Sequence, residues 1–310
     1  MSETRATVVA FIGLGHMGAP MAANLVRAGV DVRGVDLSAE AVEHARALGV
    51  PIAESGAAAV AEADVAITML PVGRHVLAAY TGGETGVGLL AAARPGTLFI
   101  ECSTIAVDDA RRAHELALAA GHRNVDAPVS GGVMGAEAAT LAFMVGGDDA
   151  DVAEARPLLD LMGRRVVHCG GPGLGQAAKV CNNMILGVSM IAVSEAFVLG
   201  EKLGLSHEAL FEVAANASGQ CWALTTNCPV PGPVPGSPAN NEYRPGFAGA
   251  LMAKDLDLAA QAIAATGVHA EAGILAAEIY RRFAAGEGAM MDFSGIITEI
   301  RERSDGGAAA

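Results

Sequence analysis

The sequence predicts an α/β domain with a parallel sheet, followed by an all-α domain. Through about residue 172, short apolar runs alternate with amphipathic segments, the pattern of βαβ units. After Gly175 the alternation stops and long helical segments take over. We therefore expect an α/β domain over residues 1–172, an all-helical domain over 173–303 and a disordered tail over 304–310.

Composition excludes several classes of protein. The 310 residues suffice for about two domains, and the net charge of −14 argues against a nucleic-acid partner, which needs clustered Lys and Arg. Five scattered cysteines without a CxxC pair predict reduced thiols, and eight histidines without metal-ligand spacing predict no metal site. The N-terminus lacks the pattern of a signal peptide, so we expect a cytoplasmic protein.

Strands are expected wherever a short apolar run stands between turn signals. These runs are Thr7–Ile12, Val30–Val35, Val65–Leu70, Leu98–Glu101, Asn124–Ala127, Leu141–Val145 and Arg165–His168. Helices between them begin at capping residues, namely Ser38, Ser55 and Asp108. The positions typical of helix C-terminal caps hold Gly29, Gly49 and Gly121.

The second domain is expected to open with a long helix. Helices are predicted over Gln176–Leu203, after Ser206, over Phe247–Thr266 and over Ala270–Ala285, with a stiff surface connection at Pro229–Pro238. Residues 180–200 are apolar and long enough to span a bilayer. However, Asn182, Asn183 and Glu195 lie inside this stretch, which favours a buried helix and no membrane partner.

A dinucleotide-binding motif follows the first expected strand. Gly13, Gly15 and Gly18 form GxGxxG around His16 and Met17, where a helix begins. The first glycine permits the tight turn, the second lets the backbone approach a pyrophosphate, and the third allows close packing of helix and strand. This arrangement predicts a Rossmann domain whose turn and helix N-terminus bind the cofactor.

Asp36 ends the second expected strand, 18 residues beyond Gly18. A carboxylate there binds the ribose 2′-hydroxyl and repels a 2′-phosphate, so NAD is expected rather than NADP. A plain βαβ turn or a methyltransferase, which uses a similar glycine turn, are the alternatives on this motif alone. Leu70-Pro71 and Ser103-Thr104 also follow strands, at positions where cofactor clefts form or where strands simply end.

Two further segments carry polar groups suited to a small acidic substrate. Ser130, Gly131 and Gly132 offer a hydroxyl and backbone N–H groups as a cradle for a carboxylate, although SGG alone is also a flexible turn. Lys179 and Asn183 stand four residues apart and therefore share one face of the long helix. Because its neighbours are apolar, Lys179 is expected to transfer a proton rather than to lie in solvent.

These motifs together resemble the β-hydroxyacid dehydrogenase family. The resemblance runs from FIGLGHMGAPMAANL through MLP, CSTI, DAPVSGG and GxxGxGxxxKxxxN to MAKDLDLA and DFSGI, and it covers nearly all of residues 6–300. The segments NNMILG and NCPVPGPVPGSPANN look like the hydroxyisobutyrate branch. One departure is Glu101-Cys102, where the family often has Asp.

The resemblance implies roles for the candidate residues. It makes Lys179 the catalytic acid/base with Asn183 assisting, and it gives the substrate carboxylate to Ser130, Gly131 and Gly132. It implies contacts to NAD from Leu70, Pro71, Thr104 and Lys254. Asp255 is interpreted most simply as a helix residue paired with a neighbouring base, and we assign it no chemistry. It also implies an active site between the domains and a homodimer or homotetramer formed through the long helix.

The expected reaction is oxidation of 3-hydroxyisobutyrate to methylmalonate semialdehyde with NAD⁺, as in valine breakdown. A related dehydrogenase or reductase acting on serine, 3-hydroxypropionate or tartronate semialdehyde is an alternative. A 6-phosphogluconate-type substrate is disfavoured, because the acidic chain has no Arg and Lys cluster for a phosphate. A dinucleotide-binding sensor without turnover is the alternative from another class, but it would not need Lys179 and Asn183.

Overall fold

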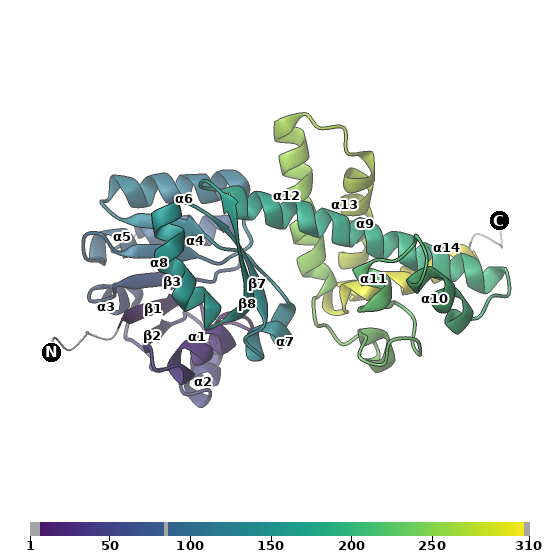
Figure 1. Ribbon diagram of the computed structural model, residues 1–310, viewed down its shortest axis with the longest axis horizontal. Helices are drawn as coiled ribbons and strands as arrows, with labels where there is room; N and C mark the ends of the chain where they lie inside the picture. The colour runs from purple at the N-terminus through teal and green to yellow at the C-terminus, as the bar shows by residue number, and fades with distance from the viewer. Residues whose placement is uncertain (1–6, 84–85, 307–310) are drawn as a thin grey trace. The chain divides into compact units, whose positions relative to one another are not determined.

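The computed structural model describes residues 7–83 and 86–306. They form two compact units, the first ending at Lys179 and the second beginning at Val180. The first is an α/β unit and the second is helical (Figure 1). Residues 307–310, the end of the tail expected to be disordered, lie outside the described residues.

One mostly parallel sheet organises the first unit. Its strand order is β2-β1-β3-β4-β5-β7-β6, with β8 paired to β7. The strands are β1 (Val8–Ile12), β2 (Asp31–Val35), β3 (Val65–Thr68), β4 (Leu98–Glu101), β5 (Arg123–Asp126), β6 (Val129–Ser130), β7 (Leu141–Gly146) and β8 (Gly163–Gly170). All seven expected strands are present; β4 has the expected ends, and the other six are shifted at one or both ends. The two-residue β6 was not expected, because it is too short to show a pattern.

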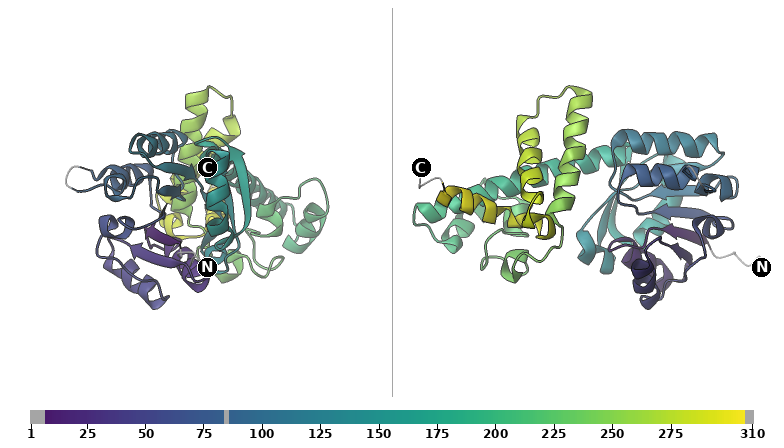
Figure 2. Two further views of the ribbon diagram at one scale, coloured as in Figure 1. Left: turned by 60° about the vertical axis from the view of Figure 1, so that its left-hand side comes forward. Right: turned by 180° about the vertical axis from the view of Figure 1, so that it is seen from behind.

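Helices cover both faces of this sheet (Figure 2). They are α1 (Gly18–Arg27), α2 (Ala39–Ala47), α3 (Gly56–Val60), α4 (Gly73–Thr81), α5 (Leu89–Ala92), α6 (Val107–Ala119), α7 (Gly132–Glu137) and α8 (Asp149–Asp160). One apolar core packs α1, α2, α7 and α8 against one face, and another packs α3 to α6 against the other. The sheet is therefore buried on both sides, as parallel sheets require.

Local capping follows the sequence at most helix ends. Ser38 and Ser55 accept hydrogen bonds from backbone N–H groups three residues on, at 3.3 and 3.1 Å. Gly29, Gly49 and Gly121 have positive φ directly after helices, as expected. The prediction for Asp108 was wrong: α6 begins after Ala106, and Asp108 lies in its first turn, where a carboxylate suits the helix dipole instead.

The register aligns the carboxyl ends of the parallel strands at one edge. Ile12 pairs with Val35 and Thr68, and Thr68 in turn pairs with Glu101. Glu101 pairs with Asp126 at the end of β5. The strand order reverses between β1 and β3, which is where ligands bind in open α/β sheets.

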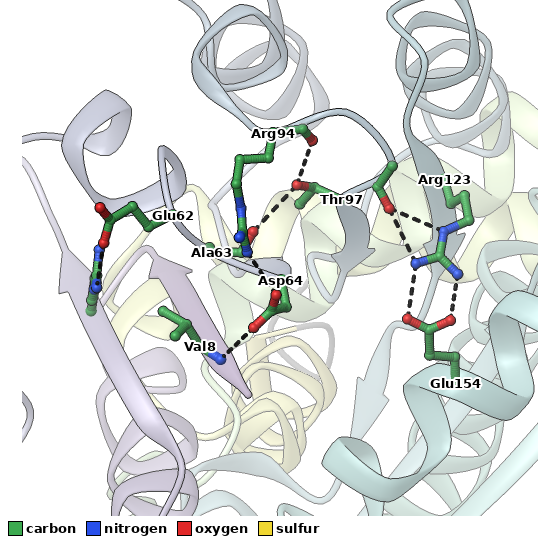
Figure 3. Close-up of polar contacts among 10 residues, drawn as sticks. Val8, Glu62, Ala63, Asp64, Arg94, Thr97, Arg123 and Glu154 are labelled. Carbon is green, nitrogen blue, oxygen red and sulfur yellow. Dashed lines mark hydrogen bonds and ion pairs between the residues drawn. The ribbon is translucent and has the colours of Figure 1, made fainter. Parts of the chain in front are cut away.

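The opposite, amino edge of the sheet is held by ion pairs near the surface (Figure 3). Arg94 binds Asp64 at 2.6 Å, and Asp64 also accepts from Val8 N at 2.9 Å. Arg123 clamps both carboxylate oxygens of Glu154 and donates to the carbonyl of Gly96. These contacts tie strands to neighbouring connections, and their solvent exposure limits what each contributes to stability.

The second unit is built on the greater part of helix α9 (Leu174–Lys202). The other elements are α10 (His207–Ala215), α11 (Trp222–Thr225), η1 (Pro238–Asn241), α12 (Gly249–Thr266), α13 (Glu271–Ala284), η2 (Glu287–Met290), η3 (Phe293–Gly295) and α14 (Ile296–Gly306). A core of α9, α12, α13 and α14 side chains surrounds Met190, Leu256 and Tyr280. Because α14 continues through Gly306, residues 304–306 of the expected tail are helical.

The proline-rich segment lies largely at the surface, as its composition predicts, with residues 231–232 and 235–236 exposed and its two ends anchored in the second unit. Cys228 and Val230 are fully buried, and the Tyr243 hydroxyl donates to Pro229 O at 2.9 Å. Asn240 closes the segment by accepting from Gly232 N and donating to Val234 O. Polar side chains downstream therefore hold a segment whose prolines have no backbone N–H to donate.

Among the described helices, α9 is long and apolar enough to cross a membrane by length and composition alone. Central helices of soluble proteins pass the same test. Asn183 and Ser194 are both buried on α9, with exposed fractions of 2% and 0%. Buried polar residues on such a helix favour packing against protein, because polar groups in hydrocarbon are costly.

A carboxylate is buried at the end of β4. Glu101 is 1% exposed and accepts from Ser103 N at 2.8 Å and from the Thr68 hydroxyl at 3.4 Å. Burial raises the pKa of Glu101 from 4.5 to about 8, with the charge of Asp126 adding to the rise and the bonds from Ser103 opposing it. The side chain that departs from the family pattern therefore holds its proton near neutral pH.

Glu101→Gln should change how stability depends on pH. Between about pH 4.5 and 8 the folded protein keeps a proton that the unfolded chain has lost, so the free energy of unfolding falls as pH rises. One such group contributes about 1.4 kcal/mol per pH unit. In denaturant unfolding, the free energy of unfolding of the variant relative to that of wild type should rise by about 2 kcal/mol between pH 5 and 7. The exposed Glu62→Gln is the control, and parallel curves for Glu101→Gln would contradict the prediction.

Candidate active site

The glycine turn after β1 has the steric form that a dinucleotide requires. Gly13 has φ of +98°, and a Cβ there would lie 2.2 Å from Met69 O. A Cβ on Gly18 would lie 1.9 Å from Gly13 O, so both positions exclude any side chain. By contrast, nothing lies within 4 Å of a Cβ on Gly15, which leaves its side of the turn open to a ligand.

The first turn of α1 is accessible at this point. Gly15 and His16 are exposed, Met17 is half-buried, and no side chain caps the helix at Met17. The backbone N–H groups at a helix N-terminus carry partial positive charge and bind phosphates. The turn therefore fits the pyrophosphate of a dinucleotide, with His16 and Met17 beside it.

Asp36 is fixed next to the glycine turn by two backbone donors. Its Oδ2 accepts from Leu14 N at 2.7 Å, and its Oδ1 accepts from Ser38 N at 2.8 Å. Each oxygen keeps a lone pair for a further donor. The carboxylate is thus oriented before any ligand arrives, in the position expected for a contact to ribose.

The connections after β3 and β4 are tied together at the same edge of the sheet. Ser103 Oγ accepts from Leu70 N at 2.8 Å. Pro71 is exposed and Thr104 is half-buried, so both present surface where the strands end. The structure brings Leu70, Pro71 and Thr104 to the carboxyl edge that also carries the glycine turn.

The expected carboxylate cradle lies between β6 and α7. Ser130 pairs with Ala142 of β7, which fixes its backbone, and Gly131 and Gly132 follow with positive φ. Asn24 of α1 donates to Ala136 O at 2.6 Å, so the dinucleotide helix also holds α7. The loop is a braced turn rather than a free one.

Asp126 fixes the beginning of α9. Its Oδ1 accepts from Gly173 N at 2.7 Å and its Oδ2 accepts from Gln176 N at 2.8 Å. A Cβ on Gly175 would lie 2.3 Å from Met144 O, so this glycine allows the helix to pack directly on the strands. Burial raises the pKa of Asp126, and the backbone donors oppose that rise. The glycine-rich turn before α9 therefore serves packing of the helix on the strands.

Lys179 and Asn183 lie on the same face of α9, one turn apart. Their exposed fractions are 6% and 2%, which is unusual for lysine. Asn183 donates to Asp255 Oδ2 at 2.5 Å and accepts from the Asn182 amide at 3.0 Å. The orientation of the Asn183 amide is therefore determined by its neighbours.

Asp255 has a role that the sequence did not indicate. It is 4% exposed on α12, where Lys254 Nζ lies 3.1 Å from its Oδ1. The neighbouring base was expected, but the hydrogen bond to Asn183 across 72 residues was not. Lys254 is half-buried beside this pair in the second unit.

The sequence analysis did not identify the residues whose side chains hydrogen-bond to distant segments around the candidate site. They are Asn24, Asp126, Gln176 and Asp255, and each stands inside a quoted motif without a role of its own. Their partners are distant in sequence, so spacing gave no signal. Among the described residues no group of three metal-ligating side chains occurs.

Two known sequence families match the chain, and they meet at nearly the domain boundary that we predicted from the sequence. Residues 8–171 match the NAD binding domain of 6-phosphogluconate dehydrogenase. Residues 173–300 match the family described as NAD-binding of NADP-dependent 3-hydroxyisobutyrate dehydrogenase.

Curated relatives span almost the full chain. A probable 3-hydroxyisobutyrate dehydrogenase of Mycobacterium tuberculosis is 58% identical, over 96% of this chain and 99% of the relative. An NAD-dependent L-serine dehydrogenase of Pseudomonas aeruginosa is 48% identical, over 92% and 95%. A solved structure of the M. tuberculosis 3-hydroxyisobutyrate dehydrogenase with L-serine has a TM-score of 0.91, covering 96% of this chain and 99% of that one. On this sequence and structural evidence, the chain belongs to the 3-hydroxyisobutyrate dehydrogenase family of NAD-linked oxidoreductases.

Proposed function

We propose that this enzyme oxidises 3-hydroxyisobutyrate to methylmalonate semialdehyde, with Lys179 as the general acid/base. The observation that carries the proposal is the buried Lys179 one helical turn from the buried Asn183. The bound nicotinamide supplies the acceptor for the hydride that leaves the hydroxymethyl carbon. The protein must then bind the acid, orient the alcohol and remove its proton.

Lys179 removes the proton in this proposal. In its neutral form the amine accepts the hydroxyl proton as the C–O bond becomes a carbonyl, and in the reverse direction the ammonium returns it. Proton transfer by a positioned side chain contributes about 10²–10⁴-fold to a rate. Asn183 binds the substrate oxygen or the lysine, and Asp255 keeps the Asn183 amide in one orientation.

The substrate carboxylate is assigned to Ser130, Gly131 and Gly132. Consecutive backbone N–H groups at positive φ form an anion-binding concavity, and the serine hydroxyl adds a donor. Because the bracing bond from Asn24 holds the following helix, the cradle is formed before substrate binds. A fixed carboxylate restricts the positions that the hydroxymethyl group can reach.

Asp36 supports NAD rather than NADP as the cofactor. Its carboxylate is already oriented by Leu14 N and Ser38 N, so a 2′-phosphate would meet a fixed negative charge. The contacts assigned to Gly13, Gly15, His16, Met17, Gly18, Leu70, Pro71, Thr104 and Lys254 belong to the same proposal. The homodimer or homotetramer, the cytoplasmic location and the role in valine breakdown stay predictions.

L-Serine is the second candidate substrate. It is favoured by the 48% identical relative described as a serine dehydrogenase and by the solved relative with L-serine. Both acids carry a hydroxymethyl group next to the carbon that bears the carboxylate. They differ in a methyl or ammonium group, and discrimination of one methyl in a pocket is worth only about 1–3 kcal/mol.

A substrate panel tests the reaction itself. NADH formation at 340 nm should be fastest, by kcat/KM, with 3-hydroxyisobutyrate and NAD⁺, compared with L-serine, glycerate, 3-hydroxypropionate and NADP⁺. A higher kcat/KM with serine would move the assignment to the second candidate. Turnover with NADP⁺ alone would show that Asp36 does not select the cofactor.

Lys179→Ala should lower kcat by about 10²–10⁴-fold, because the hydroxyl proton loses its acceptor. NAD binding, measured by fluorescence titration, should persist, since the glycine turn and Asp36 are unchanged. Lys202→Ala is the matched control, because that lysine lies exposed near the end of the same helix and pairs with Asp305. Wild-type turnover in Lys179→Ala would remove the lysine from the mechanism.

Asp255→Asn should lower kcat by about 10-fold, because an amide facing Asn183 no longer enforces one orientation of it. Asp257→Asn on the same helix is the control, since Asp257 forms a half-exposed ion pair with Arg281 at 2.7 Å. Steady-state kinetics on both variants, with melting temperatures, separate the effect on rate from that on folding. Equal rates in the two variants would leave Asp255 with a structural role only.

A further inference from the structure

We infer that Gln176 is a positioning residue that fixes Lys179 relative to the cofactor-binding loop at Ser103–Ile105. Gln176 is fully buried in the first turn of α9, three residues before Lys179. The inference rests on the proposed role of Lys179, and it concerns a side chain that does not itself need to touch the substrate.

Both the oxygen and the nitrogen of the Gln176 side-chain amide form hydrogen bonds to the backbone of one short loop. Its Oε1 accepts from Ile105 N at 3.2 Å, and its Nε2 donates to Ser103 O at 2.7 Å. Thr104, the expected NAD contact, is the residue between these two partners. A planar amide with two bonds to alternate backbone groups sets both the distance and the orientation of the loop.

The same residue joins this loop to the rest of the carboxyl edge. Its backbone N–H donates to Asp126 at the end of β5, and its Nε2 lies 3.4 Å from Glu101 Oε2. Ser103 in turn accepts from Leu70 N, so the connection after β3 is included. Gln176 is thus the member of α9 through which strands β3, β4 and β5 determine where the helix starts.

Glutamine suits this position better than any acid. Glu101 of β4 and Asp126 of β5 face it, while Tyr80 and Cys102 face Glu101. Burial and the charge of Glu101 raise the pKa of Tyr80 and Cys102 well above their ordinary values, so both stay neutral. A third carboxyl group would have to be ionised beside Asp126 or hold a proton as Glu101 does, whereas a neutral amide supplies a donor and an acceptor without introducing a charge.

Gln176→Met keeps the volume of the side chain and removes both of its hydrogen bonds. We expect kcat to fall by about 10–100-fold, since a small displacement of a catalytic group is enough for that. The KM for the hydroxy acid should change by less than about threefold, because the cradle at 130–132 is untouched. Gln261→Met, at an exposed glutamine of α12, is the control and should leave kcat unchanged.

Gln176→Glu provides a pH readout that a merely structural role would not produce. A protonated glutamate has the shape of glutamine and can accept from Ile105 N while donating to Ser103 O. An ionised one cannot donate. The ratio of variant to wild-type kcat should therefore rise as pH falls from 9 to 6, and a ratio that stays constant would overturn the inference. This test also decides the matter if Gln176→Met does not fold.

The variant Lys179→Ala separates this inference from the proposed function. Combined with Gln176→Met, it should show no further loss of kcat, because the lysine to be positioned is absent. If the loss of kcat in the double variant were the product of the two single losses, the positioning role of Gln176 would be overturned. The proposed role of Lys179 would be unaffected. Full activity of Lys179→Ala alone would instead overturn the proposed function.

Discussion

The two hydrogen bonds to the Asp126 carboxylate are the constraint on which the rest of the active site depends. They attach the first turn of α9 to the end of β5, at the edge where the glycine turn, Asp36 and the connections after β3 and β4 also lie. Gly175 permits that attachment by lacking a side chain. Together with the side-chain hydrogen bonds of Gln176, this attachment fixes Lys179 relative to the strand ends.

This attachment buries the carboxyl group of Asp126 at the carboxyl edge of the sheet. The carboxyl groups at the two edges of the sheet have different kinds of partner. At the amino edge, arginines meet carboxylates near solvent, as Arg94 does Asp64. At the carboxyl edge, Glu101 and Asp126 form no ion pair with an arginine of the described residues, and they accept hydrogen bonds from backbone and amide donors. Burial raises the pKa of both groups, and for Glu101 the rise to about 8 makes the free energy of unfolding fall as pH rises toward that value.

The sequence predicted most of what depends on local pattern. Alternating apolar runs located seven strands, and serines and glycines located helix ends, because their causes lie within a few residues. The dinucleotide turn was predictable for the same reason, since Gly13, Gly18 and Asp36 act at fixed spacings. Even Lys179 could be singled out, because an isolated lysine among apolar neighbours on a helix is unusual.

What the sequence could not provide was the set of long-range partners. Asn24 binds a carbonyl 112 residues away, and Asp255 binds an amide 72 residues away. Both are ordinary helix residues by composition. The proline-rich segment lies largely at the surface as predicted, but its attachment through Asn240 and Tyr243 could not be predicted from the prolines themselves.

The division of the chain falls inside a continuous helix, since Lys179 ends one unit and Val180 begins the other within α9. A loop at such a boundary would tolerate changes of length, whereas a helix does not. One residue inserted between Lys179 and Asn183 would turn the amide by about 100° around the axis, away from the lysine. Evolution can therefore replace exposed residues here, such as Cys181, but it cannot lengthen or shorten this stretch of the gene without separating the two groups.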